Sequence, residues 1–213
     1  QISAAGMGLA LGRTIDPLTG KEVTGSGFDN GGSHAGRGGY YSIGDSWAET
    51  FDDPNNPQFG GGGGGTRGGG GGGGVIRVTS PLLNVAGLID ADGSGGSAGG
   101  AGGSIVLKVG ALTGSGQIRA RGYTTPDLVF GGGGGGIINI SYATSTFPDA
   151  NLSVAGGSGL KPGEPGVIVK NVTSIAPTLV SSAPLFVKVN TTFNYAPVAV
   201  GTPPITWSIS KHP

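Results

Sequence analysis

The chain contains no cysteine, which excludes disulfide bridges, thiolate metal sites and a cysteine nucleophile. Histidine is nearly as scarce, because only His34 and His212 occur among the 213 residues. A serine–histidine–aspartate triad would have to be built on one of these two. His34 lies in a glycine-rich motif between Ser33 and Arg37, where a structural hydrogen bond to a neighbouring turn is the favoured interpretation. No enzymatic activity is therefore expected.

Charge is also scarce, and it is balanced. Twelve basic residues stand against twelve acidic ones, only 11% of the chain is charged, and no lysine or arginine cluster stands out. A protein that binds nucleic acid or an anionic membrane surface needs a local excess of positive charge, so neither partner is expected. No apolar run reaches the roughly 18 residues that a membrane-spanning helix requires, so membrane insertion is not expected either.

Glycine, by contrast, supplies 49 residues and forms three uninterrupted runs, at residues 60–65, 68–74 and 131–136. Each run ends at or near a short β-branched segment. Collagen is excluded because no Gly-X-Y period runs through the chain. A flexible linker would alternate glycine with serine and stay disordered, since ordering glycine costs more conformational entropy than ordering any other residue. The runs therefore indicate ordered β structure.

Two short apolar elements recur along the chain. The first follows the glycine stretches, and its equivalent positions are Ile76, Ile105, Ile138 and Val167. The second has the pattern apolar, polar, small, polar, glycine, and its equivalent positions begin at Ile2, Ile89, Ile118 and Leu152. Strand-like repeats with a period of about 20–50 residues predict a parallel β-solenoid. The expected inward positions are Ile76, Val78, Ile89, Ala91, Ile105, Leu107, Ile118, Ala120, Ile138, Ile140, Leu152 and Val154.

The glycine runs predict a second kind of packing. Extended polyglycine can adopt a left-handed helix with three residues per turn, and without β-carbons several such helices can pack at very short range. We expect residues 60–74, 94–103 and 131–136 to lie beside one another on one side of the solenoid, with flexible surface loops as the alternative. Between Ile2 and Ile89 there is room for about three further, degenerate repeats.

The composition changes near residue 174, where glycine almost disappears and proline and threonine recur. We expect a glycine-rich β-solenoid over residues 1–173 and a second segment over residues 174–213. The pattern from Phe193 to Ile209 resembles the opening strands of bacterial immunoglobulin-like or cadherin-like repeats. Such a sandwich needs about 100 residues, so this one is either truncated or completed by strands of another copy. The residues expected to take part in assembly are Phe193, Tyr195, Ile205, Trp207 and Ile209.

The motifs at residues 31–39, 87–93, 102–105 and 116–122 resemble a glycine-rich repeat found in large secreted or surface-attached microbial proteins. The resemblance implies an extracellular or cell-surface location, a right-handed β-helix-like module, a structural or adhesive role and no catalytic residues. The expected fold class is therefore all-β: a glycine-rich parallel β-solenoid with packed polyglycine segments, followed by a partial immunoglobulin-like β segment.

Acidic residues supply two candidate features. Asp90 and Asp92 have the spacing of a Ca²⁺ loop, but they lack the further ligands of one. Arginines occupy the same two slots one repeat later, at Arg119 and Arg121, so pairing between adjacent repeats is the favoured interpretation. A separate cluster could hold a weakly bound Ca²⁺, and no other cofactor is expected. Its members are Asp45, Glu49, Asp52 and Asp53.

These observations favour an extracellular structural protein: a subunit of a surface filament or fibre that assembles with copies of itself, or the stalk of an adhesin. Solenoids leave open ends, and no strong cap is visible because residues 1–3 already fit the repeat. The alternative function is the binding of a surface glycan on an aromatic stacking platform. That platform would consist of Tyr40, Tyr41, Trp47 and Phe51.

Overall fold

The computed structural model describes residues 1–40, 48–126, 129–173, 178–179 and 198–200. The chain divides into two units, Gln1–Asn171 and Val172–Pro213, and the first of these carries most of the described structure. Its described residues form strands and irregular segments, with one short 3₁₀ turn, η1 (Asp149–Asn151). The all-β fold class predicted from the sequence is confirmed.

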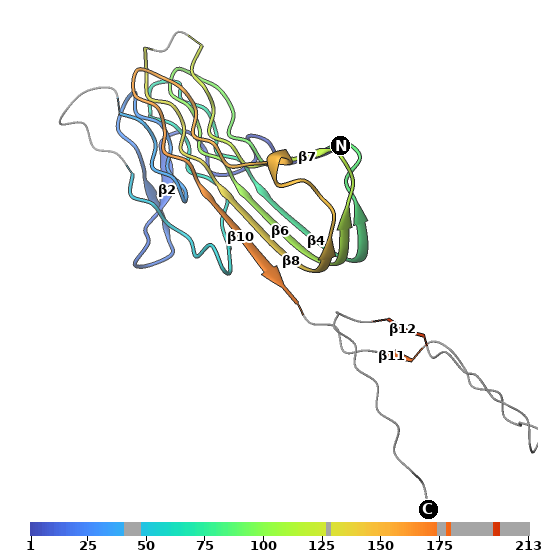
Figure 1. Ribbon diagram of the computed structural model, residues 1–213. Helices are drawn as coiled ribbons and strands as arrows, with labels where there is room; N and C mark the ends of the chain where they lie inside the picture. The colour runs from blue at the N-terminus through green and yellow to red at the C-terminus, as the bar shows by residue number, and fades with distance from the viewer. Residues whose placement is uncertain (41–47, 127–128, 174–177, 180–197, 201–213) are drawn as a thin grey trace, which may run out of the picture. The chain divides into compact units, whose positions relative to one another are not determined.

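Two parallel sheets build the first unit (Figure 1). The first sheet contains, in spatial order, β1 (Ile2–Ser3), β5 (Leu88–Asp90), β7 (Gln117–Arg119) and β9 (Leu152–Ser153). The second contains β4 (Val75–Asn84), β6 (Ser104–Thr113), β8 (Ile137–Ser145) and β10 (Val167–Val172). Each repeat runs through a short strand of the first sheet, a glycine-rich excursion and a long strand of the second. The excursions and the two sheets together form a parallel β-solenoid.

The sequence repeats predict eight equivalent positions, four in each sheet. Seven of them pair with one another in the predicted register. In the first sheet, Ile89 lies between Ile2 and Ile118 in neighbouring strands, and Ile118 is followed by Leu152. In the second sheet, Ile105 lies between Ile76 and Ile138. Parallel pairing without a register shift places equivalent side chains directly above one another. Aliphatic columns therefore form inside the solenoid.

These columns make the hydrophobic core. Nine of the twelve positions predicted to point inward are buried members of a single cluster, and the other three, Val78, Leu152 and Val154, pack against it. Ile105, Leu107, Ile118 and Ile138 have no exposed surface at all. Burial of this kind stabilises a fold by roughly 1.5–3 kcal/mol for each large aliphatic side chain. All twelve predicted core positions are confirmed.

The prediction for the eighth position, Val167, is wrong by one residue. The amide of Val167 donates to the Gly136 carbonyl, just as the Ile137 amide donates to the Gly103 carbonyl. Val167 is therefore the equivalent of Ile137, and Ile168 takes the inward slot of Ile138. Val167 also lines a surface hollow on the outer face of the sheet, which agrees with an outward side chain.

The three extra repeats expected between Ile2 and Ile89 are absent from the stack, because these two residues are direct neighbours in adjacent strands. Residues 4–74 instead form one long excursion between β1 and β4. It contains an antiparallel hairpin, β2 (Arg13–Ile15) and β3 (Glu22–Thr24). The region is therefore a single elaborated repeat.

The glycine-rich excursions pack against one another with a period of three residues. The amides of residues 131–136 donate, in order, to the carbonyls of Asp29, Lys161, Tyr123, Gly32, Glu164 and Ala120. The amides of Gly131 and Gly134 therefore donate to the segment 29–32. Those of Gly132 and Gly135 donate to the segment 161–164, and those of Gly133 and Gly136 to the segment 120–123. Three residues per turn is the period of the polyproline II helix. Each extended segment is thus hydrogen-bonded to several parallel or antiparallel neighbours at once, as in a bundle.

Only glycine fits most of these positions. A β-carbon on Gly72 would lie 1.8 Å from the Gly61 carbonyl oxygen, far inside van der Waals contact. Hydrogen bonds join Gly73 to Ala101 and Gly99 to Gly131, so the three segments predicted to pack together are direct neighbours. The packed-polyglycine prediction is confirmed, and flexible loops are not the correct description of these runs.

In the second unit, the structure describes an antiparallel pair of two-residue strands, β11 (Thr178–Leu179) and β12 (Ala199–Val200). The resemblance to immunoglobulin-like repeats falls on a stretch that lies outside the described residues. The same is true of the five residues proposed for assembly: Phe193, Tyr195, Ile205, Trp207 and Ile209.

Candidate functional site

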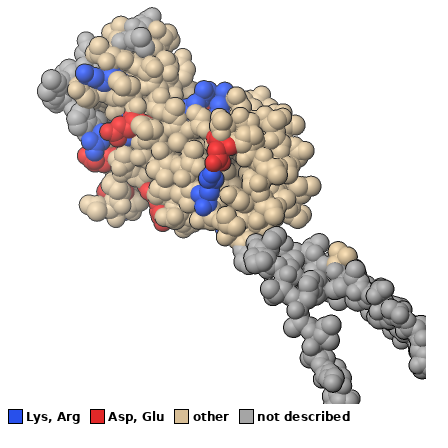
Figure 2. Space-filling model, viewed as in Figure 1, with Lys and Arg blue, Asp and Glu red and all other residues tan. Residues whose placement is uncertain are grey.

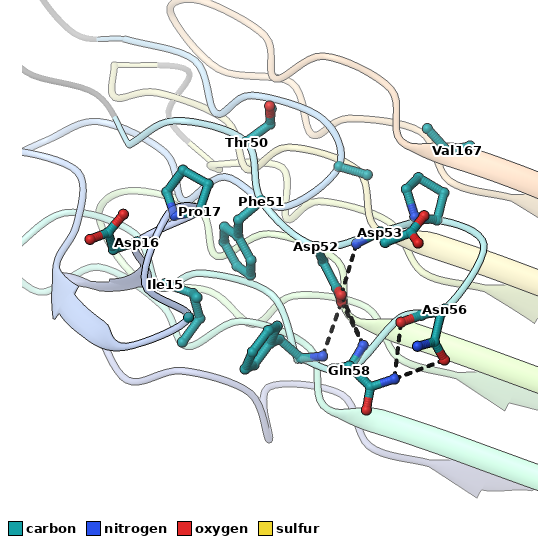
Figure 3. A pocket seen from close by; sticks show the side chains of 14 residues that line it. Ile15, Asp16, Pro17, Thr50, Phe51, Asp52, Asp53, Asn56, Gln58 and Val167 are labelled. Carbon is teal, nitrogen blue, oxygen red and sulfur yellow. Dashed lines mark hydrogen bonds between the residues drawn. The ribbon is translucent and has the colours of Figure 1, made fainter.

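A hollow of about 640 Å³ lies between the β2–β3 hairpin and the segment 50–59 (Figure 3). Its floor is apolar, with Ile15, Phe51 and Phe59, and its rim is polar, with Asp16 and Gln58 among others. An apolar floor with a polar rim is the usual composition of a small-ligand site. The hollow includes two of the four acids proposed for Ca²⁺ and one of the four aromatics proposed for glycan binding.

The segment 50–59 is held on the outer face of the second sheet by side chains from three strands. Arg77 of β4 donates to the Pro57 carbonyl, Ser104 of β6 donates to the Phe59 carbonyl at 2.8 Å, and Asn139 of β8 donates to the Pro54 carbonyl at 2.7 Å. Polar side chains on the outward face of these strands therefore position the wall of the hollow. This also explains why Asn139 is buried on a face that would otherwise be solvated.

Asp52 organises the turn that forms this wall. Its carboxylate accepts hydrogen bonds from the backbone amides of Gln58, at 2.9 Å, and Phe59, at 3.0 Å (Figure 3). Its backbone has φ of 76°, in the left-handed region that aspartate tolerates better than most residues. Burial opposes ionisation of this carboxyl, but the hydrogen bonds from His34, Phe59 and Gln58 outweigh burial and lower the pKa of Asp52.

His34 pins the same turn to the glycine bundle. The imidazole is completely buried, with Nδ1 2.8 Å from the Gly102 carbonyl oxygen and Nε2 3.3 Å from Oδ2 of Asp52. Its ring also packs against Phe51, with the centroids 5.0 Å apart. Both ring nitrogens are therefore occupied by protein groups, and neither reaches a serine hydroxyl. The sequence predicts a hydrogen bond from His34 to a neighbouring turn, and His34 does form hydrogen bonds, although its partners are distant in sequence.

Of the four acids proposed for Ca²⁺, the structure describes three, and each of these has a protein partner. Glu49 pairs with Arg37 at 2.9 Å, Asp53 accepts the amide of Asn55 at 2.9 Å, and Asp52 is engaged by His34 and backbone amides. Asp45 lies outside the described residues. Across the ranges that the structure describes, no three histidine, aspartate or glutamate side chains are grouped as a metal site would require.

Of the four aromatic residues proposed for glycan stacking, the structure describes Tyr40 and Phe51, and each contacts another side chain of the fold. Phe51 is only 4% exposed and packs edge-on against Phe59, so it offers almost no face to a sugar ring. Tyr40 lies under Lys161, whose amine is 5.7 Å from the ring centroid. Tyr41 and Trp47 lie outside the described residues. Tyr40 is therefore the one member of the four for which the structure describes a partly exposed ring.

The predicted charge pairing between adjacent repeats is confirmed. Asp92 accepts the backbone amide of Arg121 at 2.7 Å and its guanidinium at 2.8 Å. Arg119 lies 3.3 Å from Asp90 and 3.4 Å from Asp92. Each pair joins β5 or the residues after it to the next repeat, and the carboxylates are 10–14% exposed. These four residues act as a charged clamp on one side of the stack.

Charge elsewhere is dispersed. Figure 2 shows small groups of acidic and basic side chains lying near one another on the visible face, without a broad region of one sign. Among the residues that the structure describes, no helix has the length and apolar character needed to cross a bilayer. The face seen in Figure 2 thus presents no concentrated field for a highly charged partner.

Comparisons with known proteins identify no relative for this chain. It matches no family model, no curated protein and no solved structure.

Proposed function

We propose that this chain is an extracellular structural protein, either the subunit of a surface filament or fibre or the stalk of an adhesin. The observation that carries the proposal is the glycine bundle fused to the solenoid. More than a dozen glycines of the three runs are committed to main-chain packing that admits no side chain. Such an arrangement supplies rigidity and close packing, and it leaves few side chains available for chemistry.

The residues that could carry chemistry are used for structure. His34 and Asp52 bond to each other and to the backbone, and Asp92 joins two arginines of the next repeat. Catalytic groups normally keep a free face toward the substrate. These contacts support a structural role over an enzymatic one.

Assembly with copies of the same chain is supported by the open sheet edges. Among the described strands, β4 and β10 each pair on one side only. Unpaired strand edges can bind a further strand. The extracellular location rests on the resemblance of residues 87–93 and 116–122 to repeats of secreted microbial proteins.

The proposal is tested by imaging the purified native protein by cryo-electron microscopy. Ordered fibres whose axial repeat matches one subunit are expected. Monodisperse particles at all concentrations, with no self-association by analytical ultracentrifugation, would contradict the filament role.

Glycan binding is the second candidate, and the hollow beside segment 50–59 is the observation that favours it. Its rim includes hydroxyl, carboxylate and amide groups over an apolar floor. The test is calorimetric titration of neutral oligosaccharides into the native protein and the Gln58→Ala variant. Binding that Gln58→Ala weakens would support this role, and heat changes equal to buffer dilution would exclude it at the concentrations used.

A further inference from the structure

The two edge strands of the second sheet, β4 and β10, carry free backbone amides and carbonyls that could pair with each other in a parallel ladder. The Ser104 amide donates to the Gly74 carbonyl, and the Val167 amide donates to the Gly136 carbonyl. Because backbone groups alternate along a strand, Val75, Arg77 and Thr79 direct their amides away from β6. Ile168, Lys170 and Val172 likewise direct theirs away from β8. No described strand pairs with either of these edges.

A second copy stacked head to tail would continue the ladder. Its Val75 would take the position next to Val167, which places its Ile76 beside Ile168 and its Val78 beside Lys170. The apolar surface for such stacking exists, since Ile168 is 38% exposed and Val172 is 66% exposed. Backbone direction and apolar side chains alone would therefore favour polymerisation of the solenoid end to end.

Lys170 opposes this continuation. It occupies the inward slot that Val78, Leu107 and Ile140 fill in the other three long strands. Its ammonium group lies 2.5 Å from a carboxylate oxygen of Asp149, in η1. Asp149 is 72% exposed, so the pair directs the lysine toward solvent and away from the core.

Stacking a second copy would bury this ion pair between two apolar layers. Removing both charges from water carries a desolvation penalty that their mutual attraction offsets only when the geometry is excellent. An inward charge on a terminal strand is one of the known ways in which proteins prevent edge-to-edge association. Pro81 adds a second obstacle, because it has no amide to donate at the next outward position of β4.

We propose that Lys170, held by Asp149, guards the β10 end of the solenoid against a second copy of the chain. This inference rests on the proposed function, because it assumes that the chain assembles with copies of itself. It adds that the assembly does not occur by end-to-end stacking at β10. Filament contacts then do not pair β10 of one copy with β4 of the next, and the open edges stay available to other strands of another copy.

The test uses a cysteine pair, which is specific because the chain has no cysteine of its own. In the head-to-tail register, Thr79 of one copy lies beside Asn171 of the next. Neighbouring strands are about 4.8 Å apart, within reach of a disulfide. Thr79→Cys and Asn171→Cys are introduced together into the full chain, and oxidised samples are resolved on a non-reducing gel. A ladder of linked multimers reports stacking of the ends.

Two substitutions are compared in this background. Lys170→Val restores an aliphatic side chain to the inward slot, whereas Lys108→Val removes the same charge from the exposed outer face of β6. We expect Lys170→Val to increase the linked multimers by about tenfold or more. The parent with Lys170 and the Lys108→Val control are expected to remain mostly monomeric on the gel.

A strong ladder in the parent, or an equal one in Lys108→Val, would overturn the proposal. So would the absence of a ladder in both Lys170→Val and Lys170→Ile when thermal melting shows that both are folded. The outcome is separable from the proposed function. If the native protein forms fibres and the cysteine-pair parent gives no ladder, both the filament role and the guard role of Lys170 are supported. If it forms fibres and the parent gives a ladder, only the guard role is overturned. If it forms no fibres, only the filament role is contradicted.

Discussion

Gly133 and Gly100 approach so closely that a β-carbon on Gly133 would lie 1.9 Å from the Gly100 carbonyl oxygen. The obstacle is backbone, which cannot move without breaking the hydrogen bonds of the bundle. We therefore expect Gly133→Ala to lower the free energy of unfolding by about 3 kcal/mol or more. Chemical denaturation of the purified variant measures this change.

The matched control is Gly87→Ala. No atom lies within 4 Å of the β-carbon that this change would add. The variant should be unchanged or stabilised by up to about 1 kcal/mol, because alanine restricts the unfolded chain. Equal effects of the two substitutions would contradict the idea that close packing selects glycine at Gly133.

The buried contact between His34 and Asp52 predicts a loss of stability in acid. The pKa of Asp52 is lowered in the folded protein, so its contribution is fully present above the unfolded value of about 3.9. That contribution is lost as the pH falls through the lower, folded pKa. Melting temperature measured from pH 7 to pH 2 should show this decline.

Asp52→Asn isolates the effect. Asparagine tolerates the left-handed backbone of this position, but it cannot ionise. We expect the variant to be about 1–3 kcal/mol less stable at neutral pH, and we expect the difference from the native protein to shrink in acid. A difference that stays constant across the pH range would show that the charge of Asp52 is not responsible.

The charged clamp predicts coupling between Asp92 and Arg121. A double-mutant cycle with Asp92→Asn and Arg121→Ala should give an interaction energy of about 0.5–1 kcal/mol, reduced by solvent because the Arg121 side chain is 40% exposed. The coupling should weaken at high salt. The exposed pair of Arg13 and Glu22 serves as a control, for which we expect about 0–0.5 kcal/mol. Coupling as small at Asp92 as at this control would contradict the clamp.

Hydrogen exchange should separate the bundle from the exposed turns. The amides of Gly72, Gly102 and Gly134 donate to backbone carbonyls of neighbouring segments. They should exchange only through large opening events, whereas the amide of Leu18, in a turn where its side chain is 93% exposed, should exchange far sooner. Mass spectrometry of peptides covering both regions provides the measurement. Immediate exchange across the glycine runs would be incompatible with the packing described above.

The stacked strands could be predicted because their side chains alternate clearly. Ile89 and Ile118 are each followed by a charged residue and an alanine, so the alignment places apolar residues together and opposite charges in equivalent slots. The same alignment that found the core therefore also found the pairing of Asp92 with Arg121. Both depend on a period of two that the letters of the sequence display directly.

The alignment failed at Val167 because three apolar residues follow one another there, and alternation cannot then decide which of them points inward. The inward position of Lys170 was missed for the same reason. A hydrogen bond from Val167 to Gly136 settles the register, and nothing in the local sequence reports that bond.

Residues 4–74 could not be interpreted as one excursion, since polyglycine has no side chains whose period could be counted. The pairing of His34 with Asp52 was likewise hidden. Each was assigned from its neighbours in the chain, whereas His34 bonds to Gly102, 68 residues away. Contacts of this kind follow from the three-dimensional path of the bundle and carry no local motif.

The strands and the glycine segments repeat with different periods along the same chain. The strands have a period of two residues, and the glycine segments have a period of three. In β6 or β8, inserting one residue exchanges the inner and outer faces, and a second insertion restores them. In the bundle, one added residue turns every later amide toward a different neighbour, and only a third insertion restores the original partners. The period changes from three to two after Gly103 and again after Gly136, because β6 begins at Ser104 and β8 at Ile137. Insertions and deletions in the glycine segments that precede β6 and β8 are therefore tolerated during divergence when they add or remove three residues at a time.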